Sequence, residues 1–200
     1  MIVVISILEW CGATSVGWVC YRLAADLALN VVHASPTAKR SLPMSGTTIA
    51  IESPDQPDVI ALLRASDLYH AALYPSESNH LVDLSALLNE NVRFLVARTS
   101  GSTVVGCGAI FLCRQPTPTS AELKRMWVTP SARGTGLGKH LLSKLEATAI
   151  SEGSTVLRLE TGISQPEAIR LYKAAGYCER APFGSYTPDP LSIFMEKPVA

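Results

Sequence analysis

One short stretch constrains the fold of this chain more than any other: a strand-like run, a glycine-rich turn and the start of an amphipathic helix, all within residues 125–139. The turn contains Gly134, Gly136 and Gly138. The helix after it has an apolar face made of Leu137, Leu141, Leu142 and Leu145. Glycine adopts positive φ at little cost and lets a ligand approach the main chain closely, and the first turn of a helix presents unpaired N–H groups. The turn is therefore predicted to bind an anion such as a phosphate group.

Hydrophobic periodicity on both sides of this turn predicts an α/β (α+β) fold in the order β-α-α-β-β-β-α-β-α-β-β. The strands are expected at residues 47–51, 91–98, 103–113, 119–128 and 155–160, from Tyr177 onward, and at 191–197. The two early helices are expected after the cap Asp55, with Pro57 in the first turn, and around Leu81, Leu84 and Leu88. The helix after the turn is expected to end at Gly153, and the last helix to start at a capping box, Ser164-Gln165-Pro166-Glu167.

The charge and cysteine content exclude several classes of function. Lys plus Arg and Asp plus Glu both number 17, so no global basic field exists to attract nucleic acid or an anionic membrane. The five cysteines are odd in number and include no CxxC pair, which argues against a disulfide framework and against a zinc site. A reducing, cytoplasmic location without a bound metal is therefore expected.

The first 43 residues differ from the rest of the chain. Residues 1–21 carry a single charge, Glu9, and are about long enough to cross a bilayer, but they lack the basic start of a signal peptide. Three interpretations stay open: a membrane anchor, a helix packed on the domain, or an upstream extension with Met44 as the working start. The third is favoured, because residues 33–43 read as a Ser-, Pro- and Ala-rich linker. The expected division is an extension and linker at 1–43 and a domain at 44–200, with membrane contact only if residues 1–21 insert.

The spacing of the glycines excludes two common nucleotide sites. A Walker A loop has the pattern G-x-x-x-x-G-K-[ST], whereas Gly134 and Gly138 enclose three residues and His140 stands at the hydroxyl position. A dinucleotide-binding turn has the pattern G-x-G-x-x-G, but counting from Gly134 the third glycine position is occupied by Lys139.

A third pattern fits. Residues 133–138 (RGTGLG) match R/Q-x-x-G-x-G/A and resemble the loop that binds the coenzyme A pyrophosphate in the GNAT superfamily of N-acetyltransferases. Residues 121–128 resemble the family strand before that loop. Residues 165–177 resemble its downstream motif N-x-x-A-x-x-x-Y-x-x-x-G-[FY], with Gln165 in place of the commoner Asn. The resemblance covers about residues 47–198, and stretches near Glu160 and Tyr186 are similar to a bacterial subgroup whose substrates are mostly unassigned.

This resemblance implies a fold, a cofactor and a reaction. The fold is a mixed, mostly antiparallel central sheet with helices on both faces, and its strands splay apart where acetyl-CoA binds. The reaction is transfer of an acetyl group from acetyl-CoA to a primary amine by direct attack in a ternary complex, since no cysteine stands in the two motifs as an acyl carrier. The alternative is a non-catalytic module that binds or senses acyl-CoA.

The resemblance also implies residues that hold the cofactor. Main-chain groups of the turn would cradle the pyrophosphate, the strand before it would pair with the pantetheine arm, and Gln165 would contact that arm. The predicted cofactor-binding residues are Met126, Trp127, Val128, Arg133, Gly134, Thr135, Gly136, Leu137, Gly138, Lys139, Gln165 and Tyr172. For the side chains of Arg133 and Lys139, a solvated surface charge is an equal alternative.

Two residues are the catalytic candidates. The resemblance implies Glu122 as the base, because it lies eleven positions before Arg133, where some family members place a catalytic glutamate. Strand alternation is expected to put it on one face with Lys124, Met126 and Val128. An ordinary exposed carboxylate or an ion pair is the competing interpretation, and Glu160 or water is a rival base. Tyr172 would protonate the leaving thiolate, although its position on the apolar face of its helix also suits a core aromatic residue.

The acceptor is expected to bind where the two early helices meet. The candidates there are Tyr69, Tyr74, Glu77 and His80, with Glu160 from the opposite strand. A metal site is not expected, because the spacing of the histidines and the single glutamate is loose. Tyr186 and Arg170 could touch an acidic group of the acceptor. The expected partner is a small-molecule or peptide amine whose identity the sequence leaves open, and a homodimer is compatible with the sequence.

Overall fold

The computed structural model describes residues 46–78, 82–113 and 119–199. The interpretations of residues 1–43 lie outside these ranges, as do His80 and Leu81. Within the described ranges, no helix is both long and apolar enough to span a membrane.

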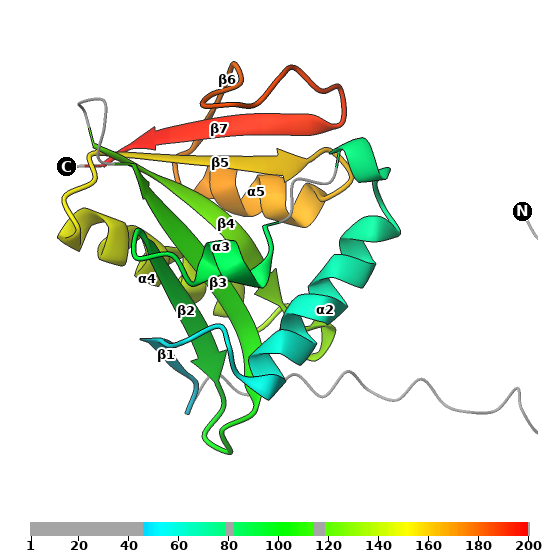
Figure 1. The fold of residues 1–200 in the computed structure, drawn as a ribbon, viewed down its shortest axis with the longest axis vertical. Coiled ribbons are helices and arrows are strands. Elements are labelled where there is room, and N and C mark those ends of the chain that lie inside the picture. The colour runs from blue at the N-terminus through cyan, green and yellow to red at the C-terminus, as the bar shows by residue number, and fades with distance from the viewer. Residues whose placement is uncertain (1–45, 79–81, 114–118, 200) are drawn as a thin grey trace, which may run out of the picture. The chain divides into compact units, whose positions relative to one another are not determined.

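Among the described residues, one sheet of seven strands forms the centre of the domain (Figure 1). The strands are β1 (Thr48–Ile51), β2 (Val92–Arg98), β3 (Val104–Cys113), β4 (Ser120–Val128), β5 (Val156–Gly162), β6 (Cys178–Arg180) and β7 (Ser192–Pro198). Their order in the sheet is β1-β2-β3-β4-β5-β7-β6, and all neighbours are antiparallel except β4 and β5, which run parallel. The predicted element order and the mostly antiparallel sheet are confirmed.

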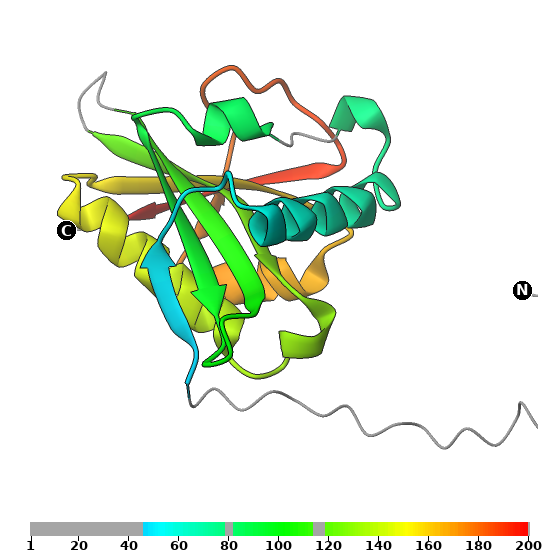
Figure 2. The same ribbon diagram turned by 60° about the horizontal axis from the view of Figure 1, so that its bottom comes forward.

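In the part of the chain that the structure describes, four α-helices cover the two faces of this sheet (Figure 2). The helices are α2 (Pro57–Ala71), α3 (Leu84–Leu87), α4 (Leu137–Ser151) and α5 (Pro166–Ala174), and two short 3₁₀ helices lie at η1 (Ser76–Ser78) and η2 (Pro130–Ala132). The first two α-helices pack with Phe94, Val96 and Trp127 on one face. The other face buries the apolar side of α4, including Leu141, Leu142 and Leu145, together with Tyr172 of α5. Helices therefore lie on both faces, as expected.

Two local predictions are wrong at helix starts. Helix α2 begins after Gln56 rather than Asp55, because the Asp55 N–H bonds to Ser53 Oγ and its carboxylate makes no cap. Helix α5 begins after Gln165, so the capping box expected at Ser164 does not form. The second early helix is a single turn capped by Asp83, which accepts the Ala86 N–H at 2.8 Å. For α2 and α5 a neighbouring residue takes the predicted cap position, which local composition does not decide.

Strand β4 carries a bulge that changes which side chains share a face. The register between β3 and β4 shifts between Cys107 and Ala109, and Arg125 opposite this shift has φ of +55°. Leu123 packs into the core under α4, whereas Trp127 packs under α2. The prediction that Glu122 and Met126 share a face is therefore wrong, because the extra residue of the bulge reverses the alternation.

Beyond this bulge, β4 and β5 diverge. Their parallel pairing runs from Ser120 to Leu123 on β4 and ends at Leu159 on β5, although β4 continues to Val128 and β5 to Gly162. The two strands open like a V in Figure 1. The splay implied by the family resemblance is thus present, and it places unpaired strand edges at the centre of the sheet.

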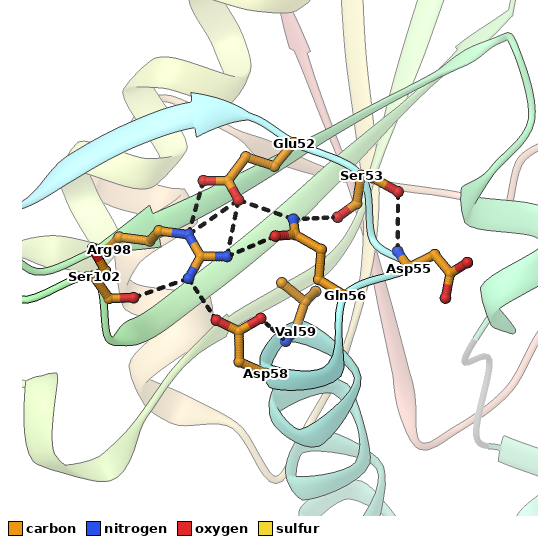
Figure 3. Close-up of polar contacts among 8 residues, drawn as sticks. All are labelled: Glu52, Ser53, Asp55, Gln56, Asp58, Val59, Arg98 and Ser102. Atoms are coloured by element: carbon orange, nitrogen blue, oxygen red, sulfur yellow. Dashed lines mark hydrogen bonds and ion pairs between the residues drawn. The ribbon is translucent and has the colours of Figure 1, made fainter.

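A separate polar cluster holds the start of α2 in place (Figure 3). The guanidinium of Arg98 on β2 donates to both carboxylate oxygens of Glu52 at 3.0 Å and to Gln56 Oε1 at 3.1 Å. It also pairs with Asp58 at 2.6 Å. One side chain therefore ties β2 to the segment between β1 and α2, and α2 in turn carries residues of the site described next.

Candidate active site

The glycine-rich turn has the backbone that its sequence predicts. Gly134 has φ of +78° and Gly136 has φ of +89°. A Cβ at either position would meet nothing within 4 Å, so the positive φ, rather than lack of space, calls for glycine here. Thr135 braces the turn, since its Oγ1 donates to the Ala132 carbonyl at 2.8 Å. The turn leads directly into α4, whose positive dipole end and first N–H groups suit an anion.

The side chain of Arg133 makes one hydrogen bond and contacts two aromatic rings beside the turn. Its Nε donates to the Val128 carbonyl at 3.2 Å. Its guanidinium carbon lies 4.6 Å from the Trp127 ring centre and 5.2 Å from that of Tyr69. Arg133 and Lys139 are both exposed, so what distinguishes Arg133 is this hydrogen bond and these ring contacts. The positive charge of Arg133 is therefore fixed beside the turn by aromatic rings, a favourable cation–π arrangement.

Two cavities meet at the opening between β4 and β5. The loop cavity lies beside the glycine turn and is lined by Tyr69, Met126, Trp127, Val128, Arg133, Gly134, Gly138, Gln165, Glu167, Ala168, Leu171 and Tyr172. The charged cavity is lined by Ser66, His70, Tyr74, Ser78, Glu122, Leu123, Lys124, Arg125, Met126, Glu160, Thr161, Gly162, Gln165, Ala168, Tyr172 and Tyr186. The residues common to both are Met126, Gln165, Ala168 and Tyr172. These four residues mark where a ligand in one cavity would meet a ligand in the other.

Tyr172 is buried at this junction, with 7% of its surface exposed. Its hydroxyl lies 3.6 Å from Met126 Sδ, and its ring packs edge-on against Tyr177 at 5.8 Å between centres. Burial, and after it the negative charge of Glu160, raise the pKa of Tyr172 above its ordinary value. The phenol therefore keeps its proton over a wide pH range, so it can act as a donor but not as a base at neutral pH.

Glu122 belongs to a network of three side chains on the wall of the charged cavity. It accepts the Tyr186 hydroxyl at 2.6 Å and pairs with Lys124 Nζ at 2.9 Å. Lys124 also donates to the Tyr186 hydroxyl, and its ammonium lies 5.0 Å from the centre of the Tyr186 ring. Burial, followed by the charge of Glu122, raises the pKa of Tyr186. The structure thus shows the ion pair that was the competing interpretation of Glu122, inside the cavity rather than on an open surface.

Tyr186 reaches Glu122 because its loop is firmly packed. The loop joins β6 to β7, and the Tyr186 ring lies 5.2 Å from Phe183 and 5.3 Å from Phe194. Arg158 and Arg180 both lie over the Phe183 ring, and both also bind Glu196 of β7. Aromatic and ionic contacts therefore hold Tyr186 against β4 from a segment far away in sequence.

Glu160 and Tyr74 complete the far end of the charged cavity. Glu160 on β5 accepts the Ser192 hydroxyl at 2.7 Å. Tyr74 is buried, and its hydroxyl accepts the Ser164 N–H at 3.0 Å. A Cβ on Gly162 would overlap the Tyr74 ring, so this glycine permits the close approach of the two segments. Tyr74 therefore links the segment after α2 to the turn between β5 and α5.

The structure places the residues predicted to bind the acceptor in different cavities. Tyr74 and Glu160 line the charged cavity, but Tyr69 lines the loop cavity and stacks on Trp127 at 4.9 Å. The side chain of Glu77 and all of His80 lie outside the described part of the chain. Arg170 is exposed and pairs with Glu167 at 3.4 Å.

Sequence reasoning placed Lys124 on the same strand face as Glu122 but did not name Lys124 or Arg125 as a site residue, and it left Tyr186 without a partner. No local signal indicated Arg125, whose guanidinium is turned toward α2, where it pairs with Asp67 and donates to the Leu63 carbonyl at 3.3 Å.

Among the described residues, no group of three or more His, Cys, Asp or Glu side chains could hold a metal ion. Three described cysteines are free thiols: Cys113 and Cys178 are exposed, and Cys107 is buried. Burial raises the pKa of Cys107 to about 12, so its thiol is a poor nucleophile at neutral pH.

Comparison with known proteins identifies relatives. A sequence model of the acetyltransferase (GNAT) family matches residues 59–177. An IAA acetyltransferase of Azospirillum brasilense is 51% identical over 156 residues, which are 78% of this chain and 100% of the relative. A crystal structure from Klebsiella pneumoniae, whose proposed activity is acyl-CoA N-acyltransferase, is 42% identical with a TM-score of 0.67 and covers 77% of this chain and 98% of that one. The PaiA N-acetyltransferase of Thermoplasma acidophilum, solved with coenzyme A, is 20% identical with a TM-score of 0.58, over 76% of this chain and 99% of that one, and shares the fold.

Proposed function

Because the chain belongs to the GNAT family of acetyltransferases, we propose that it transfers an acetyl group from acetyl-CoA to a primary amine by direct attack in a ternary complex. The observation that carries this proposal is the meeting of two cavities at the opening between β4 and β5, with Tyr172 in the wall of both. One cavity offers a phosphate-binding turn, and the other offers carboxylates and hydroxyls. A thioester and an amine bound on the two sides would meet at Tyr172 and Met126.

The loop cavity is the binding site for acetyl-CoA in this proposal. The N–H groups of the turn and the positive dipole end of α4 would hold the pyrophosphate, and Arg133 would add a positive charge beside them. The edge of β4 beyond Leu123 has lost its β5 partner, so its main chain can pair with the amide-containing pantetheine arm as an added strand would. When bound, acetyl-CoA supplies the thioester that is attacked.

Glu122 is the proposed base that removes a proton from the acceptor ammonium, directly or through water. It lines the charged cavity and is held by Tyr186 at 2.6 Å. Its pairing with Lys124 means that the acceptor must compete for this carboxylate. Glu160 lies in the same cavity on the opposite strand and is the rival candidate.

Tyr172 is the proposed acid that protonates the leaving thiolate. Its raised pKa keeps the phenol protonated, and its place at the junction of the cavities matches where the sulfur would depart. No described cysteine lines either cavity, and the buried Cys107 is shielded as well. Direct attack is therefore favoured over an acyl-cysteine route.

Release of free thiol from acetyl-CoA, measured over a panel of amines, amino acids and peptides, tests this function. The panel includes IAA, after which the Azospirillum brasilense relative is named. We expect thiol release that depends on one class of acceptor, together with saturable binding of CoA measured by calorimetry. Tight CoA binding without release for any acceptor would instead identify a non-catalytic acyl-CoA-binding or sensing module.

A further inference from the structure

The charged cavity contains a lysine, which is an unexpected neighbour for an amine acceptor. Lys124 Nζ lies 2.9 Å from Glu122, and the two side chains are only 17% and 16% exposed. We infer that the preferred acceptor carries a carboxylate as well as its amine, and that Lys124 is the residue that recognises this carboxylate. This inference rests on the proposed acetyl transfer and narrows the acceptor to amino acids or similar amine acids.

Electrostatics gives the first reason. A primary amine arrives at neutral pH as an ammonium ion, and a fixed ammonium on the cavity wall repels it with little screening when both are partly buried. A cavity meant for simple amines would carry carboxylates without a lysine among them. A cation placed beside the proposed base therefore selects against acceptors that bring only positive charge.

The exchange of partners gives the second reason. An acceptor with one ammonium and one carboxylate can replace both halves of the existing ion pair: its ammonium binds Glu122 and its carboxylate binds Lys124. A simple amine that takes Glu122 leaves Lys124 partly buried without a counter-charge, which is strongly unfavourable. The resting ion pair thus has the same charge pattern as the acceptor that would displace it.

The neighbouring Arg125 also lines this cavity, and its Nε has no hydrogen-bond partner among the described residues, but its terminal nitrogens bind α2. Lys124 is the cation that pairs with the proposed base itself, which assigns this role to Lys124. The Arg125 side chain is 3% exposed and pairs with Asp67 of α2. Lys124, in contrast, is joined to Tyr186 and Glu122 within the cavity wall itself. Tyr186 accepts from Lys124 and donates to Glu122, and its hydroxyl can hold both groups in place while the acceptor enters.

Matched acceptors test this inference. Amino acids are compared with their carboxamides, which keep the side chain and the amine but lose the negative charge, and kcat/KM is corrected for the fraction of neutral amine. We expect the wild-type protein to prefer the acids at least about tenfold. In Lys124→Met, which keeps the length of the side chain without its charge, the ratio of acid to amide should fall toward one.

Lys197→Met is the matched control. Lys197 pairs with Glu146 at 3.0 Å, at a similar exposure of 24% and 16%, and neither residue lines a cavity. This variant should lose some thermal stability but retain the wild-type ratio of acid to amide. An equal loss with acids and amides in Lys124→Met would show a merely structural ion pair and overturn the inference, and so would a wild-type protein that accepts amides as well as acids.

Measurements of acceptor binding test this inference independently of the proposed reaction. Acids and amides are titrated calorimetrically into the protein saturated with CoA, so no turnover is needed. Tighter binding of acids by at least about tenfold, lost in Lys124→Met, supports the inference even if no thiol is released. Equal affinity for acids and amides overturns it, whatever the outcome of the thiol assay.

Discussion

The two cavities differ in how their walls are built. The loop cavity is formed largely by two short stretches, the end of β4 with its glycine turn and the start of α5. The charged cavity collects side chains from α2, η1, β4, β5, α5 and the loop between β6 and β7. The first presents main-chain groups and one fixed cation, whereas the second presents paired charges and hydroxyls. The cavity proposed for CoA is thus built mostly from residues close together in the sequence, whereas the cavity proposed for the acceptor is assembled from distant segments.

The largest effect is expected where the two cavities meet. Tyr172→Phe removes only the hydroxyl near Met126 Sδ and should lower kcat about 100-fold, because general acid catalysis typically contributes that much. CoA affinity should change little, since the ring remains. Steady-state kinetics and calorimetry measure the two quantities separately.

Tyr177→Phe is the control for this variant. Tyr177 is also buried, packs against Tyr172, and has a buried hydroxyl of its own. It lines neither cavity, so its loss should leave kcat unchanged. If both variants lost activity equally, Tyr172 would be a packing residue and the junction would have no acid of its own.

Glu122→Gln tests the charged cavity alone. Gln keeps an oxygen that can accept the Tyr186 hydroxyl but cannot take a proton, so kcat/KM should fall about 30-fold at neutral pH. The deficit should narrow as the pH approaches the pKa of the acceptor amine, because the amine then arrives neutral. The pH profile of thiol release measures this.

The rival base provides the comparison. Glu160→Gln retains an acceptor for the Ser192 hydroxyl. A larger pH-dependent deficit in Glu160→Gln than in Glu122→Gln would move the role of base to β5.

Gly136→Val tests the loop cavity alone. A β-branched residue at φ of +89° is strained, and the start of α4 should shift away from the position that suits a pyrophosphate. We expect the Kd for CoA to rise about tenfold, a smaller effect than the loss of either catalytic group.

Gly153→Val applies the same strain at the other end of α4, where φ is +85° and a Cβ also meets nothing within 4 Å. It should lower the Tm by a similar amount without changing CoA affinity. If the two variants had equal affinity for CoA, the turn would not be its binding site.

The parts of the site differ in whether local sequence patterns predict them. The positive φ of Gly134 and Gly136, the apolar face of α4 and the order of the elements all depend on local patterns, and the structure has them. The bulge at Arg125 does not, since its positive φ occurs in a residue that rarely adopts it. That single inserted position decides which side chains of β4 face which cavity.

The contact between Lys124 and Tyr186 was equally beyond local patterns. The two residues are 62 positions apart, and they meet only because β5 and β7 pair and the β6–β7 loop packs on Phe194. Periodicity predicts that a strand exists and which residues alternate, but it does not predict which loop covers its face. The charged cavity could therefore not be assembled from the sequence, whereas the loop cavity largely could.

The smallest effect on activity is expected from Arg98→Met, which breaks the cluster of Figure 3. The hydrogen bond from Arg98 lowers the pKa of Glu52 and of Asp58. Carboxyls with a lowered pKa in the folded protein stabilise it above their unfolded pKa of about 4, and this stabilisation is lost as the pH falls through the folded pKa. Arg98→Met should therefore lower the Tm by about 5 °C at pH 7, and by less as the pH falls below about 4, as calorimetry would show.

Arg98→Met also tests whether the charged cavity depends on α2 more strongly than the loop cavity does. The cluster holds the start of α2, and this helix supplies Ser66 and His70 to the charged cavity but only Tyr69 to the loop cavity. KM for the acceptor should therefore rise about twofold while the affinity for CoA stays constant, because a shift of α2 relaxes one wall of the charged cavity and leaves the glycine turn in place. Arg93→Met breaks a pair with Glu152 near the end of α4 and should change neither quantity. A loss of CoA affinity in Arg98→Met would mean that the two cavities are coupled through the sheet, and that the glycine turn is less independent than its local sequence suggests.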